Sequence, residues 1–259
     1  MYRFLIILNI TLTFIFWNSC DHNLQNEKWN NIFKKYKIKG TFILKDLSNN
    51  QLTIYNKERS DSSFLPASTF KILNSMIALQ TSAIKSVDDT IKWDGKDKGW
   101  KLWNKDQTMK SAMPISCVWF YQDLARRIGK EKMQQWINKV NYGNKSIEKE
   151  IDNFWLKGDL RITANEQVSF IEKLIYNKLP FNREIQEIVK EIMITDQTAI
   201  YTIHSKTGWT KNIGWNVGYV ETQNNRWIFV LNMEVADKQD IKFRNKITYE
   251  ILKSAKIIE

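Results

Sequence analysis

The sequence predicts an α+β protein in which an antiparallel sheet is flanked by helices and a mainly helical lobe is inserted between N-terminal and C-terminal strands. Three observations support this prediction: a β-hairpin pattern at residues 40–57, helical patterns over residues 69–192, and a return to strand patterns after Thr195. Strands at both ends of the chain favour one shared sheet. With 259 residues, 43% of them hydrophobic, the chain can bury the core of one large domain or of two lobes.

The first predicted elements are an amphipathic helix and a hairpin. Residues 23–37 combine polar and apolar positions at helical spacing. Residues 41–44 and 52–55 are rich in β-branched and aromatic side chains, and they flank turn-forming residues at 48–50. This pattern predicts two paired antiparallel strands.

Helix ends are marked most clearly in the middle of the chain. Thr163 and Glu166 form a capping box ahead of an apolar helical repeat, and Gly129 ends a helix that begins near Val118. The remaining predicted elements are strands at 199–205, 215–221 and 227–235, turns around Gly214 and at 224–225, and a helix at 240–255. The sequence contains no internal repeat and no low-complexity linker.

The net charge of +11 raises the question of a nucleic-acid or membrane-surface partner. The positive charges are scattered, however, and acidic residues interleave with them, as at 148–150 and 187–191. There is no basic stripe with interleaved aromatic residues and no nucleic-acid-binding motif. The charge is therefore interpreted as solvated faces, and no nucleic-acid partner is expected.

Residues 1–20 are predicted to be a signal peptide, and residues 21–259 the mature domain. A short basic start precedes residues 4–17, which are mostly apolar but too short and too interrupted by polar residues for a membrane span. Ser19 before Cys20 matches a bacterial lipoprotein cleavage site, so lipid attachment at Cys20 and simple cleavage nearby are both open. The protein is expected to be exported to the periplasm, free or lipid-anchored. Cys117 is the other cysteine, and no disulfide framework is implied.

Ser68 and Lys71 are the most informative pair in the sequence, because the lysine lies in a segment that is otherwise apolar. Residues 70–79 are apolar on nearly every side of a helical wheel, which predicts a buried helix. Pro66 places Ser68 near the start of this helix, and Lys71 shares a face with Ser68 one turn later. A hydroxyl beside a desolvated amine makes a nucleophile without histidine. The alternative is a lysine that extends out of the core.

The Ser-x-x-Lys spacing also occurs at residues 82–85 and 146–149, in polar surroundings where chance explains it. Three further motifs would complete a site around Ser68. Lys206-Thr207-Gly208 ends a predicted strand, where the glycine would let a substrate approach the backbone and the other two would offer a cation and a hydroxyl to a carboxylate. Ser116-Cys117-Val118 lies in a predicted loop, and Tyr142-Gly143-Asn144 is a turn by propensity.

In this order and spacing, the motifs resemble those of the penicillin-recognising serine enzymes. The local sequences are most similar to class D β-lactamases, the oxacillinase type, from about Gly40 to the C-terminus. This similarity implies a β-lactamase/transpeptidase-like fold and makes residues 21–259 the catalytic domain. It is carried by Pro66-Ala67-Ser68-Thr69-Phe70-Lys71, Ser116-x-Val118, Tyr142-Gly143-Asn144, Phe154-Trp155-Leu156 and Gly214-Trp215-x-Val217-Gly218-Tyr219.

The resemblance implies a role for each matched residue. Ser68 would be the acylated nucleophile. Lys71, carboxylated by carbon dioxide to N6-carboxylysine, would be the general base for acylation and deacylation, and Trp155 would donate its indole N–H to the carbamate. The other implied roles are proton relay by Ser116, a wall of the carbamate pocket at Val118, oxyanion-hole N–H groups at Ser68 and Trp209, binding of the substrate carboxylate by Lys206, Thr207 and Arg244, and an entrance lined by Trp103.

Elementary electrostatics agrees with this role for Lys71. A solvated lysine with a pKa near 10.4 needs roughly 4 kcal/mol to be neutral near pH 7, and desolvation lowers that cost. Only the neutral amine captures carbon dioxide, and the resulting anion needs a donor such as an indole N–H. Without such a base, an acyl-serine would persist. The expected desolvating neighbours are Phe70, Leu73, Val118 and Trp155.

Three residues depart from the needs of this chemistry. Cys117 fills the variable middle position of its motif and is expected to be a small core residue. Trp209 is bulkier than a backbone donor requires, so its ring is expected to shape the substrate wall. Strand alternation places His204 on the face of Lys206, but the chemistry has no task for it, and a packed histidine is expected.

The sequence therefore predicts hydrolysis of the β-lactam amide of penicillin-type antibiotics, with resistance as the result. Carbon dioxide or bicarbonate would be needed for Lys71, and no metal is expected because neither histidine belongs to a ligand cluster. The alternatives are a β-lactam sensor that acylates without turnover and a D,D-peptidase. Such sensors carry several membrane spans, whereas this chain has one short N-terminal apolar segment. The Phe154-Trp155-Leu156 segment favours the lactamase over the peptidase.

Overall fold

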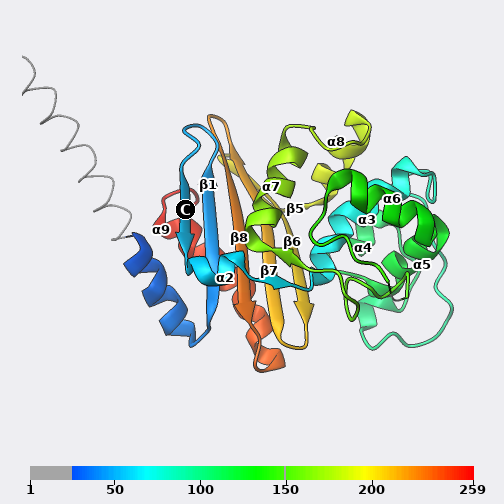
Figure 1. Ribbon diagram of the computed structural model, residues 1–259, viewed down its shortest axis with the longest axis horizontal. Helices are drawn as coiled ribbons and strands as arrows, with labels where there is room; N and C mark the ends of the chain where they lie inside the picture. The colour runs from blue at the N-terminus through cyan, green and yellow to red at the C-terminus, as the bar shows by residue number, and fades with distance from the viewer. Residues whose placement is uncertain (1–24, 149) are drawn as a thin grey trace, which may run out of the picture.

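A six-stranded antiparallel sheet with a helical lobe beside it makes up this computed structural model, which describes residues 25–148 and 150–259 (Figure 1). The predicted signal peptide and Cys20 lie outside the described residues. The strands, in their order across the sheet, are β2 (Leu52–Tyr55), β1 (Gly40–Asp46), β8 (Arg226–Glu234), β7 (Ile213–Thr222), β6 (Tyr201–Thr210) and β5 (Ile194–Gln197).

The predicted sharing of one sheet between the two ends of the chain is confirmed. β1 pairs with β2 in the predicted hairpin and with β8 on its other side, so the N-terminal strands complete a sheet that the C-terminal strands begin. A second, two-stranded sheet of β3 (Ser63–Phe64) and β4 (Ile162–Thr163) was not predicted. Its strands are too short to show a strand pattern in the sequence.

Two strand boundaries differ from the prediction in ways that affect the site. β6 continues to Thr210, so Lys206-Thr207-Gly208 lies inside the strand and not at its end. The ladder continues because these three residues pair with Val217, Asn216 and Trp215 of β7. The turn between the two strands lies at residues 211–212, and Gly214 is already part of β7.

Helices form the lobe and cover both faces of the sheet. Residues 25–36 are helical, as predicted. The other α-helices are α2 (Lys57–Asp61), α3 (Lys71–Gln80), α4 (Met109–Ala112), α5 (Val118–Ile128), α6 (Lys130–Val140), α7 (Ala164–Ile175), α8 (Arg183–Ile192) and α9 (Phe243–Ser254). Short 3₁₀ helices are η1 (Ala67–Phe70), η2 (Lys101–Trp103) and η3 (Lys238–Lys242). The capping box at Thr163 and the helix end at Gly129 are confirmed.

The middle of the chain is less helical than predicted. Long stretches without helix precede α4 and α7, at residues 81–100 and at the described residues 141–148 and 150–161. They are held by side-chain hydrogen bonds to backbone groups, which a helical wheel does not register. No helix in the described part of the chain is long and apolar enough to cross a membrane.

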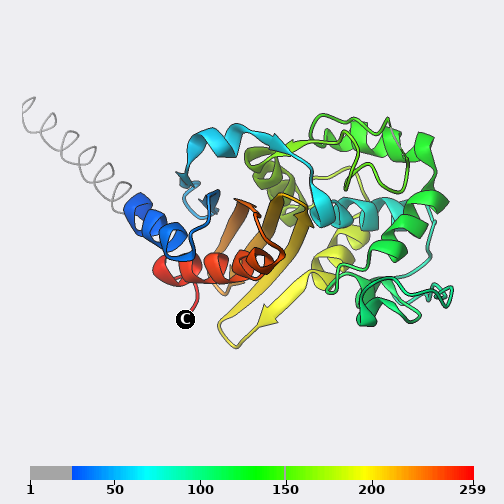
Figure 2. The same cartoon turned by 90° about the horizontal axis from the view of Figure 1, so that it is seen from below.

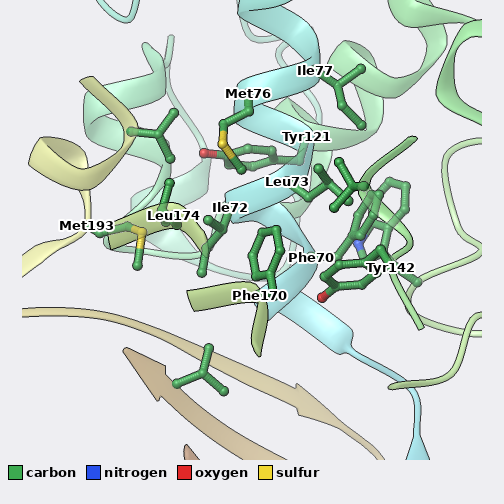
Figure 3. Close-up of a cluster of buried hydrophobic side chains, with 14 of the residues drawn as sticks. Phe70, Ile72, Leu73, Met76, Ile77, Tyr121, Tyr142, Phe170, Leu174 and Met193 are labelled. Carbon is green, nitrogen blue, oxygen red and sulfur yellow. The ribbon is translucent and has the colours of Figure 1, made fainter. Parts of the chain in front are cut away.

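Two apolar clusters lie on opposite faces of the sheet. α9 covers one face and α7 the other (Figure 2). The larger cluster lies between the sheet and α7 and extends through α3 and α5 into the lobe. Phe70, Leu73 and Phe170 are among its side chains (Figure 3). The start of α3 is therefore fixed where lobe and sheet meet.

Candidate active site

Ser68 is the second residue of η1, directly before α3, as the sequence predicts. Its side chain is nearly covered, with 7% of its surface exposed. The preceding residue, Ala67, has a φ of 51°, a left-handed conformation that costs a non-glycine residue about 1 kcal/mol or more. The Ala67 N–H donates to the Trp155 carbonyl at 3.0 Å. The turn that carries the Ser68 hydroxyl is thus strained at Ala67 and held by a backbone hydrogen bond to Trp155.

Lys71 begins α3 and is fully buried, which confirms the predicted buried lysine. Its Nζ donates to the Ser68 Oγ at 2.8 Å. Burial lowers the pKa of Lys71 from its ordinary value to about 7, because desolvation disfavours the ammonium. By contrast, Lys85 of the second Ser-x-x-Lys match is exposed.

The Trp155 indole meets two requirements of a carbamate donor. Its ring stacks on the Phe70 ring with centroids 5.5 Å apart, beside the start of α3. Its Nε1 is buried and has no hydrogen-bond acceptor among the described residues. A buried unpaired donor costs about 1–3 kcal/mol, so an anionic acceptor near Lys71 would satisfy a group that is otherwise destabilising. The residues present therefore fit a carboxylated Lys71.

Tyr121 of α5 is a neighbour of Lys71 that sequence reasoning missed. Its ring centroid lies 5.2 Å from the Lys71 Nζ. Its hydroxyl is 3.1 Å from the Ser75 Oγ and 3.7 Å from the Met113 sulfur, so the buried ring is held in place (Figure 3). The spacing from Val118 could have pointed to Tyr121, because residues three positions apart on α5 lie on the same face of the helix.

Ser116 lies in the predicted loop between α4 and α5, and the fold brings it to Lys206 in β6. The Lys206 Nζ donates to the Ser116 Oγ, and to the Thr207 carbonyl at 2.8 Å. Ser116 has a φ of 54°, again a strained conformation that fixes the hydroxyl. Val118, half-buried, begins α5 two residues later.

Lys71, Lys206 and Arg244 lie close enough at the site to influence one another electrostatically. Burial, with the nearby charges of Lys71 and Arg244, lowers the pKa of Lys206 well below its ordinary value. Burial also lowers the pKa of Arg244 to about 10. None of the three forms an ion pair with a carboxylate of the described residues. The arrangement favours an anionic ligand.

Gly208 has a packing role that the sequence did not predict, while its expected role in substrate approach stays a prediction. A Cβ there would lie 3.0 Å from the Pro66 carbonyl oxygen and 3.1 Å from the Thr69 Cγ2. The glycine therefore lets β6 pack closely against the turn that carries Ser68. This contact is within the protein and does not depend on a substrate. Arg244 contacts the same part of the sheet. Its Nη1 donates to the Gly208 carbonyl at 2.7 Å, and its side chain passes over Gly214 of β7.

The remaining predicted residues are spread around this centre. The Trp103 indole donates to the Ile115 carbonyl at 3.0 Å, next to Ser116. The Trp209 ring packs against the cluster on the α9 face, so the wall role expected for it stays a prediction. Cys117 is fully buried, as expected, and burial raises its pKa to about 11. His204 is a packed histidine, as expected: it stacks on Tyr219 with centroids 4.4 Å apart, and its Nδ1 is 2.8 Å from the Lys190 carbonyl.

The predicted turn at Tyr142 packs against the nucleophile helix. The Tyr142 and Phe70 ring centroids lie 5.8 Å apart, edge to face. Gly143 has a φ of 52°, and a Cβ there would lie 2.0 Å from the Arg161 carbonyl oxygen, so only glycine fits. Within the residues that the structure describes, no group of three or more His, Cys, Asp or Glu side chains could hold a metal ion.

Comparison with known proteins agrees with this geometry. The family model described as the penicillin binding protein transpeptidase domain matches residues 25–253. The chain is 40% identical over 238 residues to β-lactamase OXA-48 of Klebsiella pneumoniae, with 90% of each chain covered. It is 38% identical over 241 residues to β-lactamase OXA-10 of Pseudomonas aeruginosa, covering 90% of this chain and 91% of the relative.

Solved structures give the same result. The crystal structure of FUS-1 (OXA-85), a class D β-lactamase from Fusobacterium nucleatum subsp. polymorphum, superposes with a TM-score of 0.87. Its sequence is 40% identical, and the match covers 90% of this chain and 99% of that one. The chain therefore belongs to the class D β-lactamase family of the penicillin-recognising serine enzymes.

Proposed function

We propose that this protein hydrolyses the amide bond of penicillin-type β-lactams through an acyl-enzyme on Ser68, and so confers resistance to these antibiotics. The observation that carries the proposal is the 2.8 Å contact between the Ser68 Oγ and the buried amine of Lys71. With a pKa of about 7, about half of such amines are neutral at pH 7. A neutral amine at this distance can take the proton of the hydroxyl.

Acylation uses residues of the helical lobe and of the sheet. The Ser68 Oγ attacks the lactam carbonyl carbon as its proton passes to the side chain at position 71. The N–H groups of Ser68, in the first turn of η1, and of Trp209, next to Gly208, would stabilise the oxyanion. The Ser116 Oγ would give its proton to the leaving nitrogen and regain one from Lys206, to which it is hydrogen-bonded.

Substrate binding follows from the charge of the site. The carboxylate of a penicillin would lie against Lys206, Thr207 and Arg244, where no carboxylate of the described residues pairs with either cation. Trp103, whose indole is bonded to Ile115 beside Ser116, would line the entrance. Val118 would add an apolar wall beside Lys71 where α5 begins.

Turnover requires a base that activates water after acylation. We infer that Lys71 is carboxylated by carbon dioxide, and the carbamate would supply an anionic base at this position. The buried Trp155 Nε1, which lacks an acceptor among the described residues, supports this inference. Lys71 can enter this state because its buried amine is readily neutral. Trp155 would hold the modified side chain by its N–H.

Nitrocefin hydrolysis by the purified protein, with and without added bicarbonate, tests the proposal. Steady turnover that rises with bicarbonate is expected. A single stoichiometric burst with no steady state would overturn it in favour of a β-lactam sensor. Intact-mass analysis of the burst product would show whether Ser68 carries the acyl group.

We further propose that residues 1–20 direct export to the periplasm, with Cys20 as the point of lipid attachment if cleavage occurs before it. The basic start and the apolar segment at residues 4–17 support this proposal. Intact-mass analysis of the protein recovered from the membrane fraction tests it. An N-terminus at Cys20 that carries acyl chains would support lipid attachment, and an unmodified N-terminus near residue 20 would support simple cleavage; retention of residues 1–20 would contradict export with cleavage.

A further inference from the structure

Two of the most exposed large apolar side chains lie in one short segment beside the site. Trp100 is 49% exposed and Leu102 60% exposed, on either side of the start of η2. Exposed apolar side chains next to a binding cleft are candidates for ligand contact. Neither side chain has a role in the proposed acylation or in the apolar clusters described above.

Hydrogen bonds to residues near Ser116 fix the position of this segment on the helical lobe. The Trp119 indole donates to the Trp103 carbonyl at 2.9 Å, and the Trp103 indole donates to the Ile115 carbonyl. The Trp100 and Trp103 ring centroids lie 5.9 Å apart. The Trp100 ring is therefore held relative to the residue next to Ser116.

The Trp100 ring also contacts Lys238, in the 3₁₀ helix that precedes α9. The Lys238 Nζ lies 5.2 Å from the centroid of the Trp100 ring. Lys238 begins η3, whose Ile241 carbonyl accepts from the Arg244 Nε at 2.9 Å. The contact between Trp100 and Lys238 thus connects the segment that is bonded to Ile115, next to Ser116, with the 3₁₀ helix that is bonded to Arg244.

We propose that Trp100, Leu102 and Lys238 form a subsite for the acyl side chain of the β-lactam, and that it selects an aromatic side chain bearing a carboxylate. The inference rests on the proposed hydrolysis. An aromatic ring would cover the exposed Trp100 and Leu102 side chains. The exposed Lys238 ammonium, which forms no ion pair with the described residues, would bind the carboxylate.

The test compares three penicillins: benzylpenicillin, its α-carboxylated analogue, and 6-aminopenicillanic acid, which has no acyl side chain. For Trp100→Ala, kcat/KM for the carboxylated aromatic substrate should fall about five- to tenfold, mainly through KM, with Trp100→Phe within about twofold of wild type. Lys238→Ala should lower kcat/KM for that substrate about two- to fivefold and change the value for 6-aminopenicillanic acid little.

Lys242→Ala is the matched control for Lys238→Ala. Lys242 ends the same 3₁₀ helix, but its Nζ lies over the Phe243 ring, and its removal should leave the ratio between the two aromatic substrates unchanged. Equal losses in Lys238→Ala and Lys242→Ala would overturn the subsite, as would a Trp100→Ala effect of the same size on all three substrates. Failure of the proposed hydrolysis itself would differ, because the wild-type protein would then turn over none of the three.

Discussion

The Lys71 Nζ lies 2.8 Å from the Ser68 Oγ, and both side chains are buried where the helical lobe meets the sheet. Burial, and not a neighbouring histidine or carboxylate, lowers the pKa of Lys71 to about 7 and so provides the neutral amine that the proposed carboxylation requires. The same desolvation makes the lysine costly for the fold. Replacement of Lys71 by an apolar residue should therefore raise the free energy of unfolding while it removes activity.

Replacement of Lys71 by methionine should stabilise the protein and weaken the pH dependence of its stability. Unfolded Lys71 has an ordinary pKa near 10.5, whereas the folded value is about 7. The unfolded chain therefore binds more protons between pH 7 and 10.5, so the free energy of unfolding rises with pH across this window. At pH 7, Lys71→Met should be more stable than wild type by up to about 4 kcal/mol.

Urea denaturation in carbon dioxide-depleted buffer from pH 6.5 to 10 measures this effect. The rise should shrink in Lys71→Met without vanishing, because the pKa of Lys206 is also lowered. Lys85→Met, which removes an exposed lysine, is the matched control and should keep the wild-type slope. A wild-type slope in Lys71→Met would show that Lys71 is not protonated on unfolding in this range.

Replacement of Lys71 by alanine should abolish deacylation. The side chain at position 71 is the proposed base beside Ser68, and no carboxylate of the described residues forms an ion pair with it that could mark a substitute base. Stopped-flow assays with nitrocefin should show at most a slow burst of one equivalent, and mass spectrometry should find the acylated protein. Normal turnover by Lys71→Ala would remove Lys71 from the mechanism.

Changes at Trp155 should weaken the carboxylated state. In Trp155→Phe, the ring that stacks on Phe70 is largely kept while the unpaired Nε1 donor is lost. The bicarbonate concentration for half-maximal activity should rise about tenfold or more, because a hydrogen bond to a charged group contributes about 1.5–3 kcal/mol. Trp155→Ala should show the same shift with an added loss of stability from the cavity. An unchanged bicarbonate dependence in Trp155→Phe would exclude the donor role.

A methyl group at Gly208 should separate β6 from the nucleophile turn. The added Cβ would lie 3.0 Å from the Pro66 carbonyl oxygen, tighter than ordinary contacts, so one of the two segments must shift. We expect Gly208→Ala to lower kcat/KM about tenfold or more, since small displacements of reacting groups have large kinetic effects. Thr202→Ala, on the same strand away from the site, is the control. Wild-type kinetics in Gly208→Ala would show that this approach is not needed.

Local patterns carried most of the fold prediction. The hairpin at residues 40–57, the capping box at Thr163 and the end of a helix at Gly129 depend on neighbours in sequence, and all three are confirmed. The buried Lys71 could be predicted because residues 70–79 are apolar on nearly every side of a helical wheel. The motif segments then placed the residues of β6 and of the Ser116 loop in one site.

Features that depend on distant contacts could not be predicted. The extension of β6 through Lys206 depends on pairing with β7, and the tight contact at Gly208 depends on Pro66, far away in sequence. Left-handed backbone at Ala67 and Ser116 has no sequence signal, because neither residue is glycine or asparagine. The unpaired Trp155 donor is likewise visible only in the packed structure.

The proposed turnover depends on carboxylation of Lys71, which ¹³C NMR of the purified protein in ¹³C-labelled bicarbonate would detect. The wild-type protein should show a carbamate resonance that is lost on acidification below about pH 7, absent in Lys71→Ala and weakened in Trp155→Phe. Lys85→Ala should keep the resonance. Absence of the resonance from wild-type protein that turns over β-lactams, or its persistence in Lys71→Ala, would exclude a carboxylated Lys71 as the base.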